Sequence, residues 1–204
     1  PQDLLPAIAG ATSDPELPGY LSLVPTQLAT CLDAGGEVLA AMAKLHAILI
    51  GGSRLDPTLR ARAEEAGLHI VESFGMTETC GGCVYDGVPL PGVLVRTLEW
   101  DGATRIAIAG PVLLTRYLAQ DTPFHDELGT RWFISVDTGM IDAGGRLKVM
   151  GRADDVIISG GLNIPPIRVD DALKNVSGVK DAWSVGLDDE KWGQVLSFLV
   201  VPEA

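Results

Sequence analysis

The stretch that decides the fold is "LHAILIGGSRLDPTLRARAEEAGLHIVESFG", Leu45 to Gly75. It opens with the continuous apolar run of a buried strand and then reaches a glycine pair. A helix is predicted next, because Asp56 is a natural N-cap, Pro57 suits the first helical position and Gly67 is a natural stop. The final "LHIVESFG" predicts another short apolar strand. The stretch therefore predicts strand, helix, strand.

The residues on the N-terminal side repeat this alternation. "YLSLVP", Tyr20 to Pro25, predicts a strand, and "TQLATCLDAG" and "GEVLAAMAKL" predict helical segments. Alternating strands and helices imply a parallel sheet covered by helices. Ligands bind at the carboxyl ends of such strands. Two loops follow those ends here, "GGSRL" (Gly51 to Leu55) and "GMTETCGG" (Gly75 to Gly82).

From about Gly87 the sequence pattern changes from alternating strands and helices to short β-rich segments. "GVPLPGVLVRTL", "ATRIAIAGP", "RWFISVD" and "GRLKVMGR" are short β-rich pieces, which predict an antiparallel sheet or a small barrel. Near Asp154 a small α+β unit is predicted to begin. It contains "VIISGGLNI", a helix that opens at Pro165 or Pro166 and runs to about Asn175, and the strands "VKDAWSVGL" and "GQVLSFLVVP". Because the chain stops just after a strand, we expect this last unit to be incomplete.

Composition excludes several classes of function. Of the 204 residues 47% are apolar and 21% charged, which is typical of a globular protein. The formal charge of −12 argues against a nucleic-acid surface, which requires a basic patch. There is no apolar run of 18 residues and no signal-peptide pattern, so no membrane span is predicted. The missing initiator Met suggests a processed or cut chain.

The three cysteines, Cys31, Cys80 and Cys83, suit a reducing cytoplasm, and a cytoplasmic location is expected. Cys80 and Cys83 form a lone Cys-x-x-Cys pair. Zinc binding or redox chemistry is one interpretation, but a second ligand pair is missing from the pattern. Plain reduced thiols are the simpler interpretation.

Six segments, in order, carry a resemblance to a known family. They are "GGSRL", "SFGMTET", "GVPLPGV", "GPVLLTRY", "RWFISVDTG" and "GRADDVIISGGLNIPP". In this order they resemble the adenylate-forming enzymes: acyl-CoA synthetases, luciferases and peptide-synthetase adenylation domains. The resemblance implies that residues 1–153 are part of a large N-terminal nucleotide-binding domain, with an α/β portion over 1–86 and a β-rich portion over 87–153. Residues 154–204 then begin a small C-terminal α+β domain.

The resemblance implies a nucleotide site at the first two loops. Its implied members are Gly51, Gly52, Ser53, Ser73, Phe74, Gly75, Met76 and Thr77. By resemblance Thr77 contacts phosphate, Glu78 holds Mg²⁺ and Phe74 packs near the adenine. These residue types suit the implied roles, because a hydroxyl and backbone N–H groups can bind phosphate oxygens and a carboxylate can bind a hard cation. The alternative interpretation is a solvated loop with a helix-capping pattern.

Two further residues are implied to contact the nucleotide. Asp137 would accept hydrogen bonds from the ribose hydroxyls, and Arg152 would reach the ribose or phosphate. Thr77, Glu78 and Arg152 are the implied catalytic residues. Ser135 and Val136 depart from the family, which has Thr and Gly at these positions. A turn-capping Asp and a surface Arg are the alternatives.

Asp154 matches the hinge of the family, about which the C-terminal domain rotates between two half-reactions. Gly160 and Gly161 match the loop that approaches CoA after rotation. A simple tight turn is the alternative for this glycine pair.

The function implied by the resemblance is an ATP-dependent carboxylate–CoA ligase, with ATP and CoA as substrates and Mg²⁺ as cofactor. Within the family, "GMTETCGGCVYDGVPLPGV" resembles the o-succinylbenzoate–CoA ligases of menaquinone biosynthesis. The alternatives are another acyl- or aryl-CoA synthetase, a peptide-synthetase adenylation domain, and a non-catalytic nucleotide-binding module. Small molecules are the expected partners, and a homodimer is a further expectation.

Two catalytic elements of the family have no counterpart in the sequence. They are the phosphate loop that ends in lysine and the catalytic lysine that follows the last strand. We therefore expect that the 204-residue chain alone does not turn over.

Overall fold

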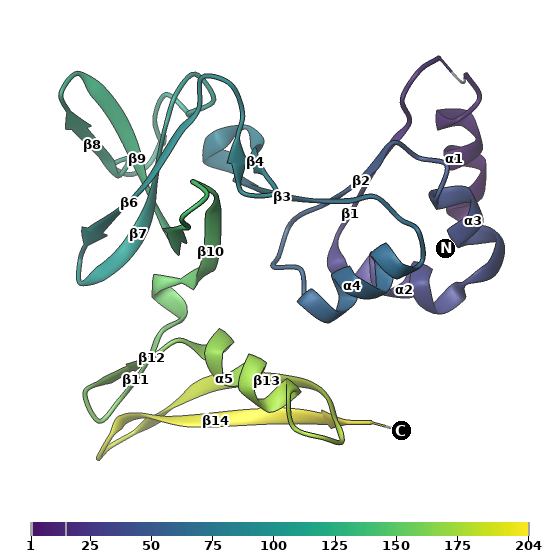
Figure 1. The fold of residues 1–204 in the computed structure, drawn as a ribbon. Coiled ribbons are helices and arrows are strands. Elements are labelled where there is room, and N and C mark those ends of the chain that lie inside the picture. The colour runs from purple at the N-terminus through teal and green to yellow at the C-terminus, as the bar shows by residue number, and fades with distance from the viewer. Residues whose placement is uncertain (1, 15, 204) are drawn as a thin grey trace.

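The computed structural model describes residues 2–14 and 16–203, which form three β-sheets in chain order (Figure 1). The helices are α1 (Leu5–Ala11), α2 (Pro25–Ala34), α3 (Gly36–Met42), α4 (Pro57–Glu65) and α5 (Pro166–Lys174), with single 3₁₀ turns at Gln2–Leu4, Thr77–Thr79 and Ala153–Asp155. The strands are β1 (Tyr20–Leu23), β2 (Ala47–Ile50), β3 (Ile70–Met76), β4 (Gly81–Tyr85), β5 (Val88–Pro89), β6 (Leu94–Trp100), β7 (Ala103–Ala109), β8 (Phe124–Glu127), β9 (Thr130–Ile141), β10 (Leu147–Arg152), β11 (Ile157–Ser159), β12 (Leu162–Ile164), β13 (Val179–Asp189) and β14 (Gly193–Pro202).

The first sheet has the order β1-β2-β3-β4-β5. Its first three strands are parallel, as predicted, and α1 to α4 gather beside them (Figure 1). Its last two strands are antiparallel, which was not predicted. The predicted loop over Gly75 to Gly82 was therefore too long, because both of its ends belong to strands. The strand β3 runs through Met76, and β4 returns from Gly81 after a single 3₁₀ turn.

The sequence predicts the boundaries of α4 well because its end signals are local. The Asp56 carboxylate accepts hydrogen bonds from the backbone N–H groups of Thr58, at 2.8 Å, and Leu59, at 3.4 Å. The helix ends at Glu65, and Gly67 adopts φ +77°, where a side chain would be strained. The expectation for Pro25 was wrong: it opens α2 instead of ending β1. Proline has a fixed φ that suits the first turn of a helix.

The core of this unit lies between the helices and β1 to β3. It contains Ile8, Leu23, Leu28, Cys31, Val38, Met42, Leu45, Ile48, Ile50, Leu55, Ala63, Leu68 and Ile70. All of these side chains are buried, which places the apolar runs of the sequence inside.

The second sheet is antiparallel, with the order β10-β9-β7-β6 and β8 paired to β9. The third sheet has the order β12-β11-β14-β13, and α5 packs on β13. The helix predicted near Pro165 or Pro166 is α5, with Pro165 at its N-cap. The elements α1 and β8 were not predicted. No helix within the described ranges has the length and apolarity that crossing a bilayer requires.

Candidate functional site

A cavity of about 340 Å³ opens at the carboxyl ends of β1, β2 and β3. It is lined by Ser22, Leu23, Val24, Gln27, Gly51, Gly52, Ser73, Gly75, Met76, Gly81 and Gly82. Five of the residues predicted for the nucleotide meet here, from the loop after β2 and from β3, which are separate in the sequence. They are Gly51, Gly52, Ser73, Gly75 and Met76. This edge of a parallel sheet is where ligands bind in α/β proteins.

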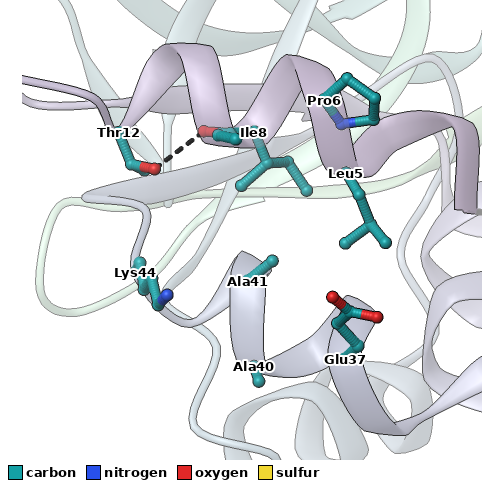
Figure 2. A pocket seen from close by; sticks show the side chains of 9 residues that line it. Leu5, Pro6, Ile8, Thr12, Glu37, Ala40, Ala41 and Lys44 are labelled. Carbon is teal, nitrogen blue, oxygen red and sulfur yellow. Dashed lines mark hydrogen bonds between the residues drawn. The ribbon is translucent and has the colours of Figure 1, made fainter.

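A larger cavity, of about 510 Å³, lies between α1 and α3 (Figure 2). Leu5 and Ile8 approach it from one helix and Ala41 from the other, and Glu37 and Lys44 stand at its margins. None of the predicted site residues lines it. Its mostly aliphatic walls offer few groups for a phosphate, so we place the candidate site in the smaller, more polar cavity.

Two glycines of the smaller cavity allow the backbones to approach closely. A Cβ atom on Gly51 would lie 2.6 Å from Oγ of Ser73, whose hydroxyl donates to the carbonyl of Ile50 at 3.3 Å. A Cβ atom on Gly75 would lie 2.0 Å from the backbone oxygen of Gly81. Any side chain at Gly75 would therefore push β3 and β4 apart.

The Thr-Glu-Thr segment forms the 3₁₀ turn between β3 and β4. Thr79 is buried, and its Oγ1 accepts from the Met76 N–H at 2.9 Å and lies 2.7 Å from the Gly81 oxygen. Thr77 is exposed, so its hydroxyl faces solvent at the end of the strand. Sequence reasoning missed Thr79, because Met76 at the N-cap and Thr79 at N3 do not match the usual Ser/Thr-x-x-Glu/Gln capping pattern.

Glu78 is held by the segment that follows β7. Its backbone oxygen accepts from the Leu114 N–H at 2.9 Å, and its Oε1 accepts from the Tyr117 hydroxyl at 2.5 Å. Burial together with this hydrogen bond raises the pKa of Tyr117 to about 12. Tyr117 closes the "GPVLLTRY" motif, but the sequence analysis gave it no role.

Glu78 fits the kind of metal site that was predicted. Among the described residues, no three or more His, Cys, Asp or Glu side chains gather as a metal-binding group. Mg²⁺ in nucleotide enzymes is commonly held by one or two carboxylates together with substrate phosphates and water. A single partly buried carboxylate is compatible with that arrangement, and Glu78 has one oxygen beyond the one bound to Tyr117.

Asp137 and Arg152 face each other across β9 and β10 as register partners. Burial raises the pKa of Asp137, and the positive charge of Arg152 opposes that rise. The Asp137 N–H donates to Oγ of buried Ser135 at 3.0 Å. Ser135, which departs from the family pattern, therefore fixes the backbone of the predicted ribose residue.

Arg152 is engaged by the residue predicted as the hinge. Its Nε and Nη2 donate to the two carboxylate oxygens of Asp154, at 2.9 and 2.6 Å. The hydrogen bond to Asp154 raises the pKa of Arg152, and the same bond lowers the pKa of Asp154. No hydrogen bond or ion pair within residues 2–14 and 16–203 joins Asp137 or Arg152 to Thr77 or Glu78.

Gly160 and Gly161 form the turn between β11 and β12, with φ +57° and +81°. The Gly160 N–H donates to the Trp192 carbonyl at 2.9 Å, and a Cβ on Gly160 would lie 2.8 Å from the Trp192 ring. Ser53 and Phe74 do not line the cavity described above. Phe74 packs against the cluster around Cys83 and Val84, and its contact with adenine stays a prediction.

Known proteins resemble this chain over most of its length. A probable 2-succinylbenzoate–CoA ligase of Mycobacterium tuberculosis is 41% identical over 187 residues, 89% of this chain and 47% of that protein. The 2-succinylbenzoate–CoA ligase of Enterococcus faecalis is 31% identical over 86% of this chain and 40% of its own length. The chain therefore spans less than half the length of these relatives.

The fold is also similar to solved structures. The o-succinylbenzoate CoA synthetase of Bacillus subtilis, in complex with its acyl-adenylate intermediate, matches 100% of this chain and 44% of its own, with 28% identity and a TM-score of 0.76. An ATP-bound RpMatB-BxBclM chimera matches with a TM-score of 0.84 at 23% identity, which supports the fold alone. The sequence profile of AMP-binding enzymes matches residues 15–118, about half of the chain. By sequence and by fold, the chain belongs to the family of AMP-binding enzymes.

Proposed function

We propose that this chain is the nucleotide-binding part of an AMP-forming carboxylate–CoA ligase whose acid is o-succinylbenzoate. The observation that carries the proposal is the cavity at the carboxyl ends of β1 to β3, where Gly51, Gly52, Ser73, Gly75 and Met76 meet. The names of its relatives support the choice of acid. The overall reaction joins the acid, ATP and CoA, and yields the acyl-CoA thioester, AMP and pyrophosphate.

The groups of the cavity suit a nucleotide monophosphate. Its glycines let a ligand approach the backbone closely, and Ser73 adds a hydroxyl. The exposed Thr77 hydroxyl, which directly follows β3, would bind a phosphate oxygen. Asp137 would accept the ribose hydroxyls, and Arg152 would donate to the ribose or phosphate.

Glu78 would hold Mg²⁺ beside the phosphates, with Tyr117 orienting the carboxylate through its hydrogen bond. When bound, this ion neutralises charge on the phosphate oxygens. The residues of the chain bind and orient the nucleotide, and the glycine backbone excludes water where it approaches the phosphate.

A thermal-shift experiment tests the proposal. At one hundred times its Kd, a non-hydrolysable o-succinylbenzoyl-adenylate analogue should stabilise the chain by about 2.7 kcal/mol, a rise in Tm of about 5–10 °C. Gly51→Val, which fills the cavity, should abolish the shift. The matched control is Gly10→Ala in α1, where nothing lies within 4 Å of a new Cβ. An unchanged Tm with the analogue, in a chain that melts cooperatively, would refute nucleotide binding.

A peptide-synthetase adenylation domain is the second candidate, supported by the shared family alone. The acceptor distinguishes the two in the full-length enzyme, because a ligase transfers the acyl group to free CoA. Gly160 and Gly161 would approach CoA, with Asp154 as the hinge. We also propose a cytoplasmic location and a homodimer, to be tested by fractionation and by sedimentation.

A further inference from the structure

Two ion pairs join the loop after β2 to α5, although these segments lie more than a hundred residues apart in sequence. Nη1 of Arg54 lies 2.9 Å from Oδ1 of Asp171, a separation of 117 positions. Nζ of Lys174 lies 3.6 Å from Oδ2 of Asp56. The loop belongs to the first unit and α5 to the last, so the pairs connect the two ends of the molecule.

In one pair the loop supplies the positive charge, and in the other pair it supplies the negative charge. This arrangement favours one alignment of the loop with α5. The loop presents a positive and then a negative charge, and α5 presents a negative and then a positive charge three residues apart, on one helix face. Like charges would meet if α5 were shifted so that Asp171 faced Asp56. The geometry therefore favours a single register between loop and helix.

Both partners of the second pair are fixed by other contacts. Asp56 caps α4 through the Thr58 N–H at 2.8 Å, and Lys174 also contacts Asp181 at 2.9 Å. Little side-chain freedom is lost when such groups meet, so this pair is better placed than two mobile surface charges. The pairing with Asp171 raises the pKa of Arg54, which is consistent with an attractive contact.

Arg54 lies two residues beyond Gly52, which lines the candidate nucleotide cavity. The loop is anchored at one end by the Gly51 N–H, which donates to the Leu23 carbonyl at 3.1 Å, and at the other end by buried Leu55. Between these anchors Gly52, Ser53 and Arg54 are exposed. The ion pair to Asp171 is the contact that restrains this exposed part.

We propose that Arg54 and Asp56 are positioning residues that dock α5 onto the nucleotide loop, so that nucleotide binding and docking of the C-terminal unit favour each other. The coupling to nucleotide rests on the proposed function, whereas the docking does not. Any rotation of the third sheet about the segment Arg152–Asp154 has to break both pairs. The pairs thus stabilise one of the orientations open to the C-terminal unit.

Charge reversal and charge exchange test the docking. Spin labels are placed on cysteines at exposed Ala61 of α4 and exposed Ala172 of α5, with Cys80 replaced by serine. The labelled chain with both ion pairs intact should give a narrow distribution of label-to-label distances at low salt and a broader one at 0.5 M salt. Arg54→Glu and Asp171→Arg should each broaden it, and the double exchange should narrow it again. Arg62→Glu, which breaks an exposed pair to Asp33 of the same type, is the control and should leave it unchanged.

The coupling is tested by AMP titration calorimetry on the same chains. Arg54→Glu and Asp171→Arg should each raise the Kd for AMP about three- to tenfold, and the exchange should restore it. Asp171→Asn, which keeps the size of the side chain, repeats the test if a reversal fails to fold. Unchanged distances in the reversals, or no rescue by the exchange, would overturn the docking. Altered distances with unchanged AMP affinity would overturn the coupling. If AMP does not bind the unmodified chain, the proposed function and the coupling fail, and the distances still decide the docking.

Discussion

The hydroxyl of Tyr117 lies 2.5 Å from Oε1 of Glu78 and joins two segments 39 residues apart. Hydrogen bonds to an ionised group are short and roughly twice as strong as neutral ones. The bond fixes one oxygen of the carboxylate and leaves the other outside this hydrogen bond. Tyr117 thereby links the segment after β7 to the turn between β3 and β4.

Tyr117→Phe should lower the free energy of unfolding by about 1.5–3 kcal/mol at neutral pH, because the bond to a charged group is lost. The pKa of Tyr117 is raised to about 12, so its stabilisation is fully present below the unfolded value near 10. It is lost as the pH rises towards 12. Urea unfolding of both proteins at pH 7, 9 and 10.5 measures the difference, which should shrink only at the highest pH.

Tyr85→Phe is the matched control, because its hydroxyl bonds to the Gly82 carbonyl at the longer distance of 3.3 Å. Its effect at pH 7 should be smaller. An equal effect of both substitutions at every pH would show that the Glu78 contact adds nothing beyond an ordinary tyrosine.

Asp137→Asn should separate stability from binding. Burial raises the pKa of Asp137, so ionising this carboxyl costs more free energy in the folded chain than in the unfolded chain. A raised pKa adds stability only below the unfolded value near 4 and withdraws it as the pH rises through the folded value. The neutral amide should therefore keep or raise the Tm of the nucleotide-free chain at pH 7, while the Kd for AMP rises about ten- to a hundredfold.

Asp142→Asn is the control of opposite sign. Asp142 accepts from the backbone N–H groups of Gly144 at 2.9 Å and Arg146 at 3.0 Å, and these bonds lower its pKa. Its replacement should lower the Tm and leave the AMP affinity unchanged. A drop in Tm for Asp137→Asn with no change in AMP affinity would contradict the ribose assignment.

Gly75→Ala should destabilise the chain by at least about 1–3 kcal/mol, because its Cβ would lie 2.0 Å from the Gly81 backbone oxygen. A backbone atom yields only if β3 and β4 separate. Gly10→Ala in α1 should instead stabilise by up to about 1 kcal/mol, since the new Cβ meets nothing. Urea unfolding of the two variants measures both changes in the free energy of unfolding. No loss of stability in Gly75→Ala would mean that the β3–β4 hairpin tolerates a wider spacing.

The parts of the structure that were predicted rest on local signals. Apolar runs and glycine stops lie next to each other in sequence, which is why β2, α4 and β3 could be located from Leu45 to Gly75. The gathering of Gly51, Ser73 and Gly75 at one cavity followed from a general rule, that the carboxyl ends of parallel strands share an edge.

The parts that were missed depend on contacts between distant residues. No local pattern reveals that Tyr117 meets Glu78, or that Arg54 meets Asp171. The strand β8 was missed because "FHDE" is polar and half exposed, and it is a strand through its pairing with β9. The start of the return strand β4 was predicted as part of a loop because "GMTETCGG" is polar and rich in glycine, whereas Gly75 permits close packing of β3 against β4.

Arg152 has two competing partners, the carboxylate of Asp154 and the proposed nucleotide. Its guanidinium donates to both oxygens of Asp154, at 2.9 and 2.6 Å, and its charge also acts on Asp137 across the strands. If Arg152 binds the nucleotide, it has to leave Asp154. Asp154→Asn should therefore lower the Kd for AMP by up to about fivefold, the equivalent of an exposed ion pair.

Arg152→Lys should do the reverse and raise the Kd for AMP about tenfold, since lysine lacks the planar fork that binds two acceptors. Arg131→Lys, which alters the exposed pair of Arg131 with Asp126 at 3.2 Å on the same sheet, should leave the affinity unchanged. Titration calorimetry on the three variants, with Tm as a check of folding, measures both effects. If Asp154→Asn weakens AMP binding as much as Arg152→Lys does, then Asp154 holds Arg152 in its binding position. The hinge carboxylate would then support the nucleotide site instead of competing with it.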